Sequence, residues 1–292
     1  MRILEKHKEK ILILALALLA LDIVVWRGVL ASSAETRFLF LDVGQGDSEL
    51  VEFPAGGGQA GGVQLLIDGG PPTGAVLREL GRALAPTDRY IDLVLMTHPQ
   101  EDHFGGLIEV LRQYDVGAFL SSGRSRDTDA YRELIRVIEE RGIRMVELGA
   151  GDRIRTSGGT VRILSPTPDL LRSDDLNDTT LVARVESGGV SALFTGDAGA
   201  PVERTLVRAG VSPVDILKVG HHGSKFSSSE EFLRALRPAV AVIEVGKNSY
   251  GHPTSETLAR LRAAGAAIFR TDERGTIEVR LGGLGLQVFT AR

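Results

Sequence analysis

Thr97-His98-Pro99-Gln100-Glu101-Asp102-His103 is the stretch of sequence that decides how this chain is interpreted. It directly follows an apolar run, residues 91–96, which is typical of a strand buried on both faces. A loop at the end of such a strand is held rigidly and aims several side chains at one point. His98, Asp102 and His103 offer two imidazoles and a carboxylate, which zinc and manganese accept as ligands. The stretch predicts a metal site, with a surface loop of unrelated charges as the competing interpretation.

Three further loops repeat this arrangement. Asp197 follows the apolar residues 193–194, where a helix cap is the alternative interpretation. His221 and His222 stand between two glycines after another apolar run, and a pair of structural histidines is the alternative there. His252 follows a fourth predicted strand. Because strand-end loops at one edge of a sheet lie together, the four loops jointly predict a shared site more strongly than any one of them.

Composition narrows the chemistry of that site. The 292 residues are 43% hydrophobic and 25% charged, which is ordinary for a globular protein, and they suffice for one large α/β domain or two small ones. A net charge of −4 gives no global attraction to nucleic acid. The chain has no cysteine, which excludes disulfides, thiolate metal sites and cysteine catalysis. A bound metal must therefore be held by His, Asp, Glu or amide groups.

The N-terminus predicts a membrane segment. Basic residues precede an apolar run, residues 11–26, which Asp22 interrupts. We expect residues 1–35 to be a single-pass signal-anchor, although a full span needs roughly 20 apolar residues. Ser32-Ser33-Ala34 is an acceptable cleavage site, so secretion after cleavage is the alternative, and a buried helix is a third possibility. The basic flank predicts a cytoplasmic N-terminus, with residues 36–292 outside the cell membrane.

The remaining pattern predicts two strand-rich halves, each with helices, and hence two sheets packed face to face with helices outside. Residues 37–53 read as a hairpin with a turn at Gly44-Gln45-Gly46-Asp47. Helices are expected at residues 76–84, 104–114, 129–142, 201–209, 230–236 and 255–264.

These motifs resemble those of the metallo-β-lactamase superfamily. Residues 98–103, HPQEDH, resemble its HxHxDH motif, and Asp68 in LLIDGG, Asp197 in FTGD and His222 in HHGS match its other ordered motifs. More narrowly, residues 37–280 resemble the C-terminal hydrolase domain of ComEC-type DNA-uptake proteins, without their membrane channel portion. That resemblance is carried by FLDVGQGD, THPQEDHFGGL, NDTTLVARV, FTGDA, LKVGHHGS and GHP. It implies an αββα sandwich with a metal centre at the edge between the sheets.

The resemblance also implies two divalent ions, Zn²⁺ or Mn²⁺. His98 would belong to the first ion, Asp197 would bridge, and the second ion would take Asp102, His103 and His222. The sequence departs from the family pattern at Gln100, which replaces the second motif histidine, and at residues 177–180, where a further histidine is expected. We therefore expect one tight ion and one weak ion, with Gln100 beside the site rather than as a strong ligand.

Catalytic roles follow as expectations. Asp102 and Asp197 would orient the attacking water, and Asp68 would position the ligand loops. His221 and His252 would protonate the leaving oxygen or stabilise charge.

The expected substrate contacts are Ser224 and Lys225, with Lys218 nearby. The resemblance implies DNA as the phosphodiester substrate, cut so that the strand not transported is destroyed, and a competence channel as partner. An aromatic content of 5% adds no independent sign of base stacking. The alternatives are a hydrolase of another phosphodiester or small molecule, and a non-catalytic binding module for which Gln100 is the main argument.

Overall fold

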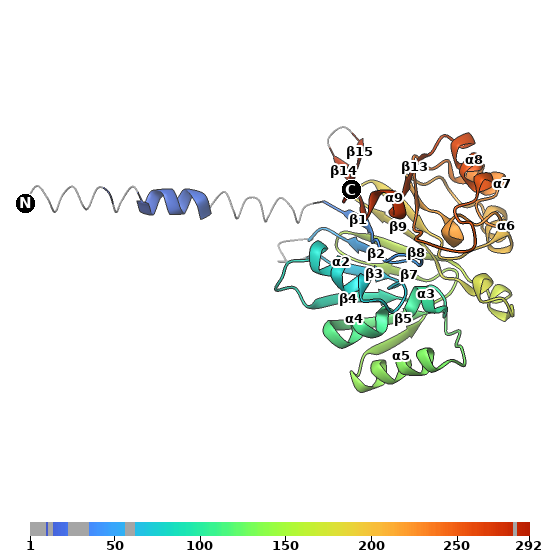
Figure 1. The fold of residues 1–292 in the computed structure, drawn as a ribbon, viewed down its shortest axis with the longest axis horizontal. Coiled ribbons are helices and arrows are strands. Elements are labelled where there is room, and N and C mark those ends of the chain that lie inside the picture. Colours follow the sequence, from blue (N-terminus) through green and yellow to red (C-terminus); the bar gives the residue numbers. More distant parts are fainter. Residues whose placement is uncertain (1–9, 11–13, 23–34, 56–61, 283–284) are drawn as a thin grey trace, which may run out of the picture.

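The computed structural model describes residues 10, 14–22, 35–55, 62–282 and 285–292. Two β-sheets lie face to face, and helices cover their outer faces (Figure 1). The four layers are those of the αββα sandwich that the sequence predicts. Residues 14–22 are helical and exposed, and they lie away from the sandwich (Figure 1).

The first sheet has eight strands, and its central hairpin is the predicted one: β1 and β2 pair antiparallel with Phe38 opposite Val51. From β3 to β6 the strands are parallel. The spatial order is β15 (Gly285–Thr290), β14 (Ile277–Gly282), β1 (Arg37–Phe40), β2 (Glu49–Glu52), β3 (Gln64–Ile67), β4 (Tyr90–Leu95), β5 (Asp115–Ser121) and β6 (Arg144–Glu147).

The second sheet has seven strands, and its parallel part runs from β10 to β13. The spatial order is β13 (Ala267–Arg270), β12 (Val240–Ile243), β11 (Ile216–Lys218), β10 (Val190–Phe194), β9 (Val182–Ser187), β8 (Gly159–Ser165) and β7 (Arg153–Arg155). Parallel strands end on the same side, so the loops after β3, β4, β10, β11 and β12 are brought to one end of the sandwich.

Three apolar clusters hold the layers together. The middle one lies between the sheets, where Phe38 and Phe40 stack on Phe194 with ring centroids 6.5 and 5.9 Å apart. The outer clusters bury α2 (Ala75–Ala83), α4 (Leu107–Gln113) and α5 (Asp129–Glu140) on the first sheet, and α6 (Ala200–Arg208), α7 (Glu230–Leu236) and α8 (Ser255–Ala263) on the second. The remaining short helices are α3 (Glu101–Phe104), α9 (Thr271–Arg274), η1 (Leu170–Arg172), η2 (Leu176–Thr179) and η3 (Gly220–Gly223).

One predicted helix is wrong in its bounds. Residues 104–114 do not form a single helix; α3 ends before Gly105 and α4 begins at Leu107. The interruption follows from close packing, because a Cβ on Gly106 would lie 2.1 Å from the carbonyl oxygen of Gly69. The break lets the loop after β4 press against the Asp68 loop, which sets up the site.

Most of the predicted anchor lies outside the described residues. No helix among the residues that are described combines the length and the apolarity that a bilayer crossing requires. The anchor stays a prediction.

Candidate metal centre

The predicted ligands meet at one end of the sandwich. Asp68 follows β3, His98 follows β4, and His103 lies on α3. From the second sheet, Asp197 follows β10 and His222 lies on η3 after β11. The rings of His98 and His103 are 4.1 Å apart between centroids, and those of His103 and His222 are 5.6 Å apart. The convergence predicted from four separated loops is therefore present.

Four buried atoms at this centre have no hydrogen-bond partner among the described residues. They are Nε2 of His98, His103 and His222, together with Oδ1 of Asp197. The Asp197 oxygen lies 3.3 Å from His103 Nε2 and 3.7 Å from His222 Nε2. A buried polar group without a partner costs about 1–3 kcal/mol, so several facing one another need an explanation. Divalent cations bound among them would satisfy these atoms.

Two of the groups whose ligand atoms lie within 4.8 Å of one another share His103. His98, His103 and Asp197 make one group, and Asp102, His103 and His222 make the other. Asp102 Oδ2 lies 3.5 Å from His222 Nε2. The residues therefore fit a divalent ion, and the second group contains the ligands expected for the tighter one.

Asp68 supports the ligands from behind. It lies 2.8 Å from His103 Nδ1 and accepts hydrogen bonds from the amide and hydroxyl of Thr97. Because the Thr97 hydroxyl donates to Asp68, it accepts from His98 Nδ1 at 3.0 Å. Both histidines thus carry their proton on Nδ1 and keep the Nε2 lone pair for a metal. Asp68 therefore lies where the expected positioning role requires, and the role itself stays a prediction.

A buried ion pair lies behind the centre, and the sequence did not reveal it. Asp47 is fully buried, with Oδ1 3.2 Å from His222 Nδ1 and Oδ2 3.6 Å from His103 Nδ1. The Lys218 ammonium binds Asp47 and the Gly196 carbonyl oxygen. The expectation that Lys218 contacts phosphate is therefore wrong, because its side chain has no exposed surface and its charge is already paired.

Two more acids lie beneath Asp47. Glu49 and Glu244 are buried, and Glu244 Oε1 accepts a hydrogen bond from the Ser48 amide. Burial raises the pKa of Glu49 to about 8, and the charge of Asp47 adds to that rise. Burial and the neighbouring Glu49 also raise the pKa of Glu244. The backbone carbonyl of Glu244 accepts from His222 Nδ1 at 2.9 Å, which fixes the third imidazole in the same tautomer.

The field of the carboxylates attracts positive charge. Burial opposes protonation of His222, but Asp197 and Asp47 outweigh it and raise its pKa to about 10. For His103, the same contest between burial and Asp197 also raises the pKa. Burial and the neighbouring His103 instead lower the pKa of His98 to about 3. In the metal-free protein, the protons on His103 and His222 supply the positive charge that the carboxylates attract. A divalent ion must displace these protons when it binds.

The open side of the centre is lined by amides and imidazoles. Gln100 Nε2 donates to Asn177 Oδ1 at 2.6 Å, and Asn177 Nδ2 lies 3.5 Å from His221 Nδ1. His221 Nε2 lies 3.6 Å from Asp197 Oδ2, and the His252 ring is 5.6 Å from the His221 ring. His221 and His222 both have positive φ, near +50°, which turns the adjacent imidazoles in different directions. His222 is buried, whereas His221 is half-buried on the open side of the centre.

The expected substrate contacts differ in exposure. Ser224 is 2% exposed, and its hydroxyl accepts a hydrogen bond from the Phe226 amide, so it serves the loop. Lys225 is exposed, and its ammonium lies 5.1 Å from the centroid of the Phe226 ring.

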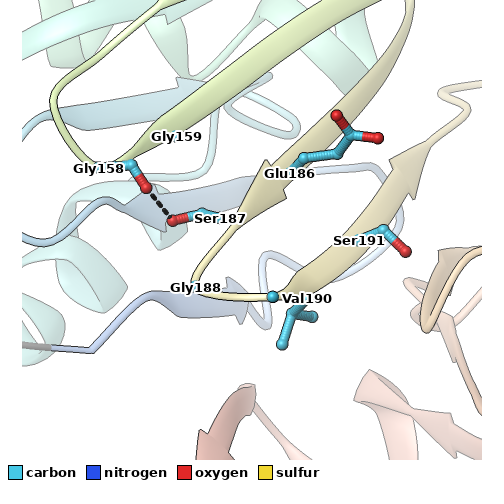
Figure 2. A pocket seen from close by; sticks show the side chains of 8 residues that line it. Gly158, Gly159, Glu186, Ser187, Gly188, Val190 and Ser191 are labelled. Carbon is cyan, nitrogen blue, oxygen red and sulfur yellow. Dashed lines mark hydrogen bonds between the residues drawn. The ribbon is translucent and has the colours of Figure 1, made fainter.

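A separate hollow lies at the opposite end of the strands. Its volume is about 430 Å³, and it is lined by residues 158–159 and 186–191 (Figure 2). The Ser187 hydroxyl donates to the Gly158 carbonyl there (Figure 2). No predicted site residue lines it.

Comparison with known proteins also indicates the metallo-β-lactamase superfamily. A family model described as the metallo-beta-lactamase superfamily matches residues 41–246. The chain is 31% identical to ComE operon protein 3 of Bacillus subtilis (strain 168) over 85% of its own length and 33% of the relative's. It is 30% identical to competence protein ComA of Neisseria gonorrhoeae, over 92% of this chain and 36% of that protein. The chain spans about a third of the length of these relatives.

Solved structures support the fold. The metallo-beta-lactamase fold protein YhfI from Bacillus subtilis aligns with a TM-score of 0.55 at 11% identity, covering 83% of this chain and 99% of that one. Igni18, a metallo hydrolase from Ignicoccus hospitalis, aligns with a TM-score of 0.52 at 18% identity, covering 84% and 98%.

Proposed function

The chain belongs to the metallo-β-lactamase superfamily, and from that premise we propose that it is a metal-dependent phosphodiesterase that cuts DNA. The observation that carries the proposal is the set of buried, unpartnered ligand atoms on His98, His103, Asp197 and His222. A relative named as a competence protein, ComA of Neisseria gonorrhoeae, favours DNA as the substrate. A catalytic role is favoured over a binding module, because the substitution at Gln100 leaves these atoms in place.

The residues fit one tight ion and one weaker ion. Asp102, His103, Asp197 and His222 would hold the tight ion, Zn²⁺ or Mn²⁺, and His98 with Asp197 would hold the weaker one. When bound, a divalent ion polarises a phosphoryl oxygen and acidifies water. The Gln100 amide is engaged with Asn177, so the weaker site has fewer nitrogen ligands than the family pattern.

The protein's own groups handle the protons. The Asp102 side chain is 36% exposed, more than the other ligands named here, and it suits acceptance of a proton from the attacking water. Burial, followed by His221 and His222, lowers the pKa of His252, so this imidazole is neutral near pH 7. It therefore suits hydrogen bonding to the substrate better than proton donation, which leaves His221 as the candidate acid.

Membrane attachment completes the proposal. Residues 1–35 would anchor the domain on the outer face of the cytoplasmic membrane, beside a DNA-uptake channel, where incoming DNA is met. Protease added to intact spheroplasts should digest residues 36–292. In untreated cells the whole chain should cofractionate with membranes. Recovery in the culture medium of a chain that has lost its N-terminal segment would favour the cleaved, secreted alternative.

The proposal is tested on the full chain loaded with Mn²⁺ or Zn²⁺. Turnover is expected on single-stranded DNA and on methyl p-nitrophenyl phosphate, a diester without a base. His103→Ala and Asp197→Ala should abolish turnover of both while thermal unfolding still shows a folded protein. Asp127→Ala, an exposed acid at the start of α5, is the matched control and should keep full activity.

The alternatives predict different outcomes. Turnover of methyl p-nitrophenyl phosphate without cutting of DNA would indicate a hydrolase of another phosphodiester. A folded, metal-loaded protein that turns over no diester would refute the enzymatic proposal and favour the binding module.

A further inference from the structure

Two aromatic side chains stand out on the surface of the domain. Phe226 is 69% exposed and Tyr250 is 73% exposed, the highest values among the large apolar side chains described in residues 35–292. Aromatic side chains are enriched where proteins bind partners, so two exposed rings beside a site indicate a binding surface. Both rings lie on loops that carry site residues, since Phe226 follows His222 and Tyr250 precedes His252.

The two loops are braced, so the rings are held in place. Asn248 Oδ1 accepts from the amides of Tyr250 and His252, both at 3.1 Å, which closes the first loop on itself. In the second loop, Arg260 donates to the Lys225 carbonyl at 3.1 Å. A ring on a rigid backbone loses little entropy when a ligand settles on it.

A row of rings connects Tyr250 with the metal centre. The centroids of Tyr250 and His252 are 5.8 Å apart, and those of His252 and His221 are 5.6 Å apart. His221 in turn lies 3.6 Å from Asp197. Phe226 reaches the same loop from another direction, because its carbonyl accepts from the Ala200 amide at 3.1 Å, three residues after Asp197.

Two lysines lie on the same two loops as the exposed rings. After residue 10 the sequence contains three lysines, Lys218, Lys225 and Lys247, against many arginines. Lys218 is buried, while Lys225 and Lys247 are exposed on the two loops of Phe226 and Tyr250. The segment just before Asn177, by contrast, exposes Asp174 and Asp175.

Resting on the phosphodiesterase function proposed above, we infer that Tyr250 and Phe226 stack on unpaired bases of a DNA strand, with Lys225 and Lys247 beside its phosphates. Basic groups alternating with aromatic platforms are how proteins hold single strands without reading their sequence. Paired bases are already stacked within a duplex and offer no free face to these rings.

The inference is tested by binding and by kinetics in the full chain. Fluorescence anisotropy with labelled (dT)15, in the absence of added divalent ion, measures binding without cutting; a hairpin duplex of equal length is the competitor. Tyr250→Ala and Phe226→Ala should each weaken (dT)15 binding by roughly 5-fold to 100-fold. Tyr250→Phe, which keeps the ring, and Phe289→Ala, which removes a 46% exposed ring on the terminal strand, should stay within about 2-fold of wild type.

The kinetic arm separates this inference from the proposed function. With metal present, Tyr250→Ala should raise KM for single-stranded DNA and leave turnover of methyl p-nitrophenyl phosphate unchanged. If wild type cuts DNA but both alanine variants bind and cut like wild type, the stacking role is wrong and the phosphodiesterase stands. If wild type hydrolyses nothing, the phosphodiesterase fails, and the anisotropy data alone decide the stacking role. Equal losses in Tyr250→Phe and Tyr250→Ala would assign the effect to the hydroxyl and overturn stacking.

Discussion

The two ends of the sandwich differ in the state of their buried polar atoms. At the metal-centre end, ligand atoms of His98, His103 and His222 are buried without a partner among the described residues. At the opposite end a hollow of about 430 Å³ is lined in part by Ser187, whose hydroxyl is bonded to Gly158 (Figure 2) and to Thr36. Unsatisfied buried groups, rather than open volume, therefore locate the chemistry of this fold.

The charged pairs of the two ends differ in the same way. Lys218 and Asp47 form an ion pair with no exposed surface on either side chain. Arg162 and Glu186, near the far hollow, are 45% and 38% exposed at 3.4 Å. The metal-centre end therefore holds a fully desolvated charge pair, whereas the Arg162–Glu186 pair stays partly in water.

Removal of a metal-binding side chain should give the largest difference between the two ends. His222→Ala deletes an atom that belongs to the tight ion group, so turnover and bound metal should fall by more than the roughly 10–100-fold that loss of a supporting residue costs. Ser187→Ala, at the far end, should change neither by more than about 2-fold. Metal analysis of the purified variants, together with phosphodiesterase assays, measures both. Equal losses in the two variants would remove the distinction between the ends.

Metal affinity should rise with pH. The pKa of His222 is raised to about 10, and that of His103 is also raised, so both imidazoles are protonated at neutral pH in the metal-free protein. A metal ion must displace these protons, and the apparent affinity should therefore gain about tenfold per pH unit for each proton lost. Competition with a chromogenic chelator between about pH 6 and pH 8 measures the slope. A flat profile would mean that the imidazoles are not protonated in the metal-free protein, which would contradict the raised pKa values.

The buried pair should matter for stability far more than the exposed one. Lys218→Met leaves the Asp47 carboxylate buried and unpaired, which should cost about 3–5 kcal/mol of unfolding free energy. Arg162→Met breaks an exposed pair and should cost about 1 kcal/mol or less. Urea unfolding of the metal-free proteins compares them, and Lys218→Met combined with Asp47→Asn should recover part of the loss. Similar costs for the two single variants would contradict the contrast.

Loss of the Asp68 charge, which supports the ligands from behind, should have a smaller effect on metal binding. Asp68→Asn keeps the size of the side chain but loses the charge that orients His103, so metal affinity should fall about 10–100-fold. Asp215→Asn is the matched change at the far end, where Asp215 accepts from the amide and hydroxyl of Ser191. It should leave metal affinity unchanged in the same titration. An unaltered affinity in Asp68→Asn would show that Thr97 alone suffices to orient the imidazoles.

The sequence predicted the ligands better than their support. His103 and Asp197 follow apolar runs at strand ends, a local pattern that can be recognised without knowledge of the fold. Asp47 was interpreted as part of a hairpin turn, and its partner Lys218 lies 171 residues away, beyond any local pattern. Glu244 sits inside an apolar strand sequence, and its burial next to Glu49 depends on how two sheets meet.

Two other features show the limits of local pattern and composition. The break between α3 and α4 depends on how closely the backbone of Gly69 approaches Gly106, which periodicity does not encode. The aromatic content of 5% says little about function, because a count ignores that Phe226 and Tyr250 are exposed beside the centre.

The smallest expected effect concerns the residue in which the chain departs from its family. Gln100→His replaces an amide that is bonded to Asn177 with an imidazole beside His98, so affinity for the weaker ion should rise by about tenfold. The tight ion should be unaffected, because none of its four ligands changes. Gln113→His places an imidazole on the exposed end of α4 and is the matched control, which should bind no further ion. Calorimetric titration counts the ions; if Gln100→His still binds one, backbone geometry rather than the missing histidine limits the weaker site, and the metal-centre end is satisfied by a single cation.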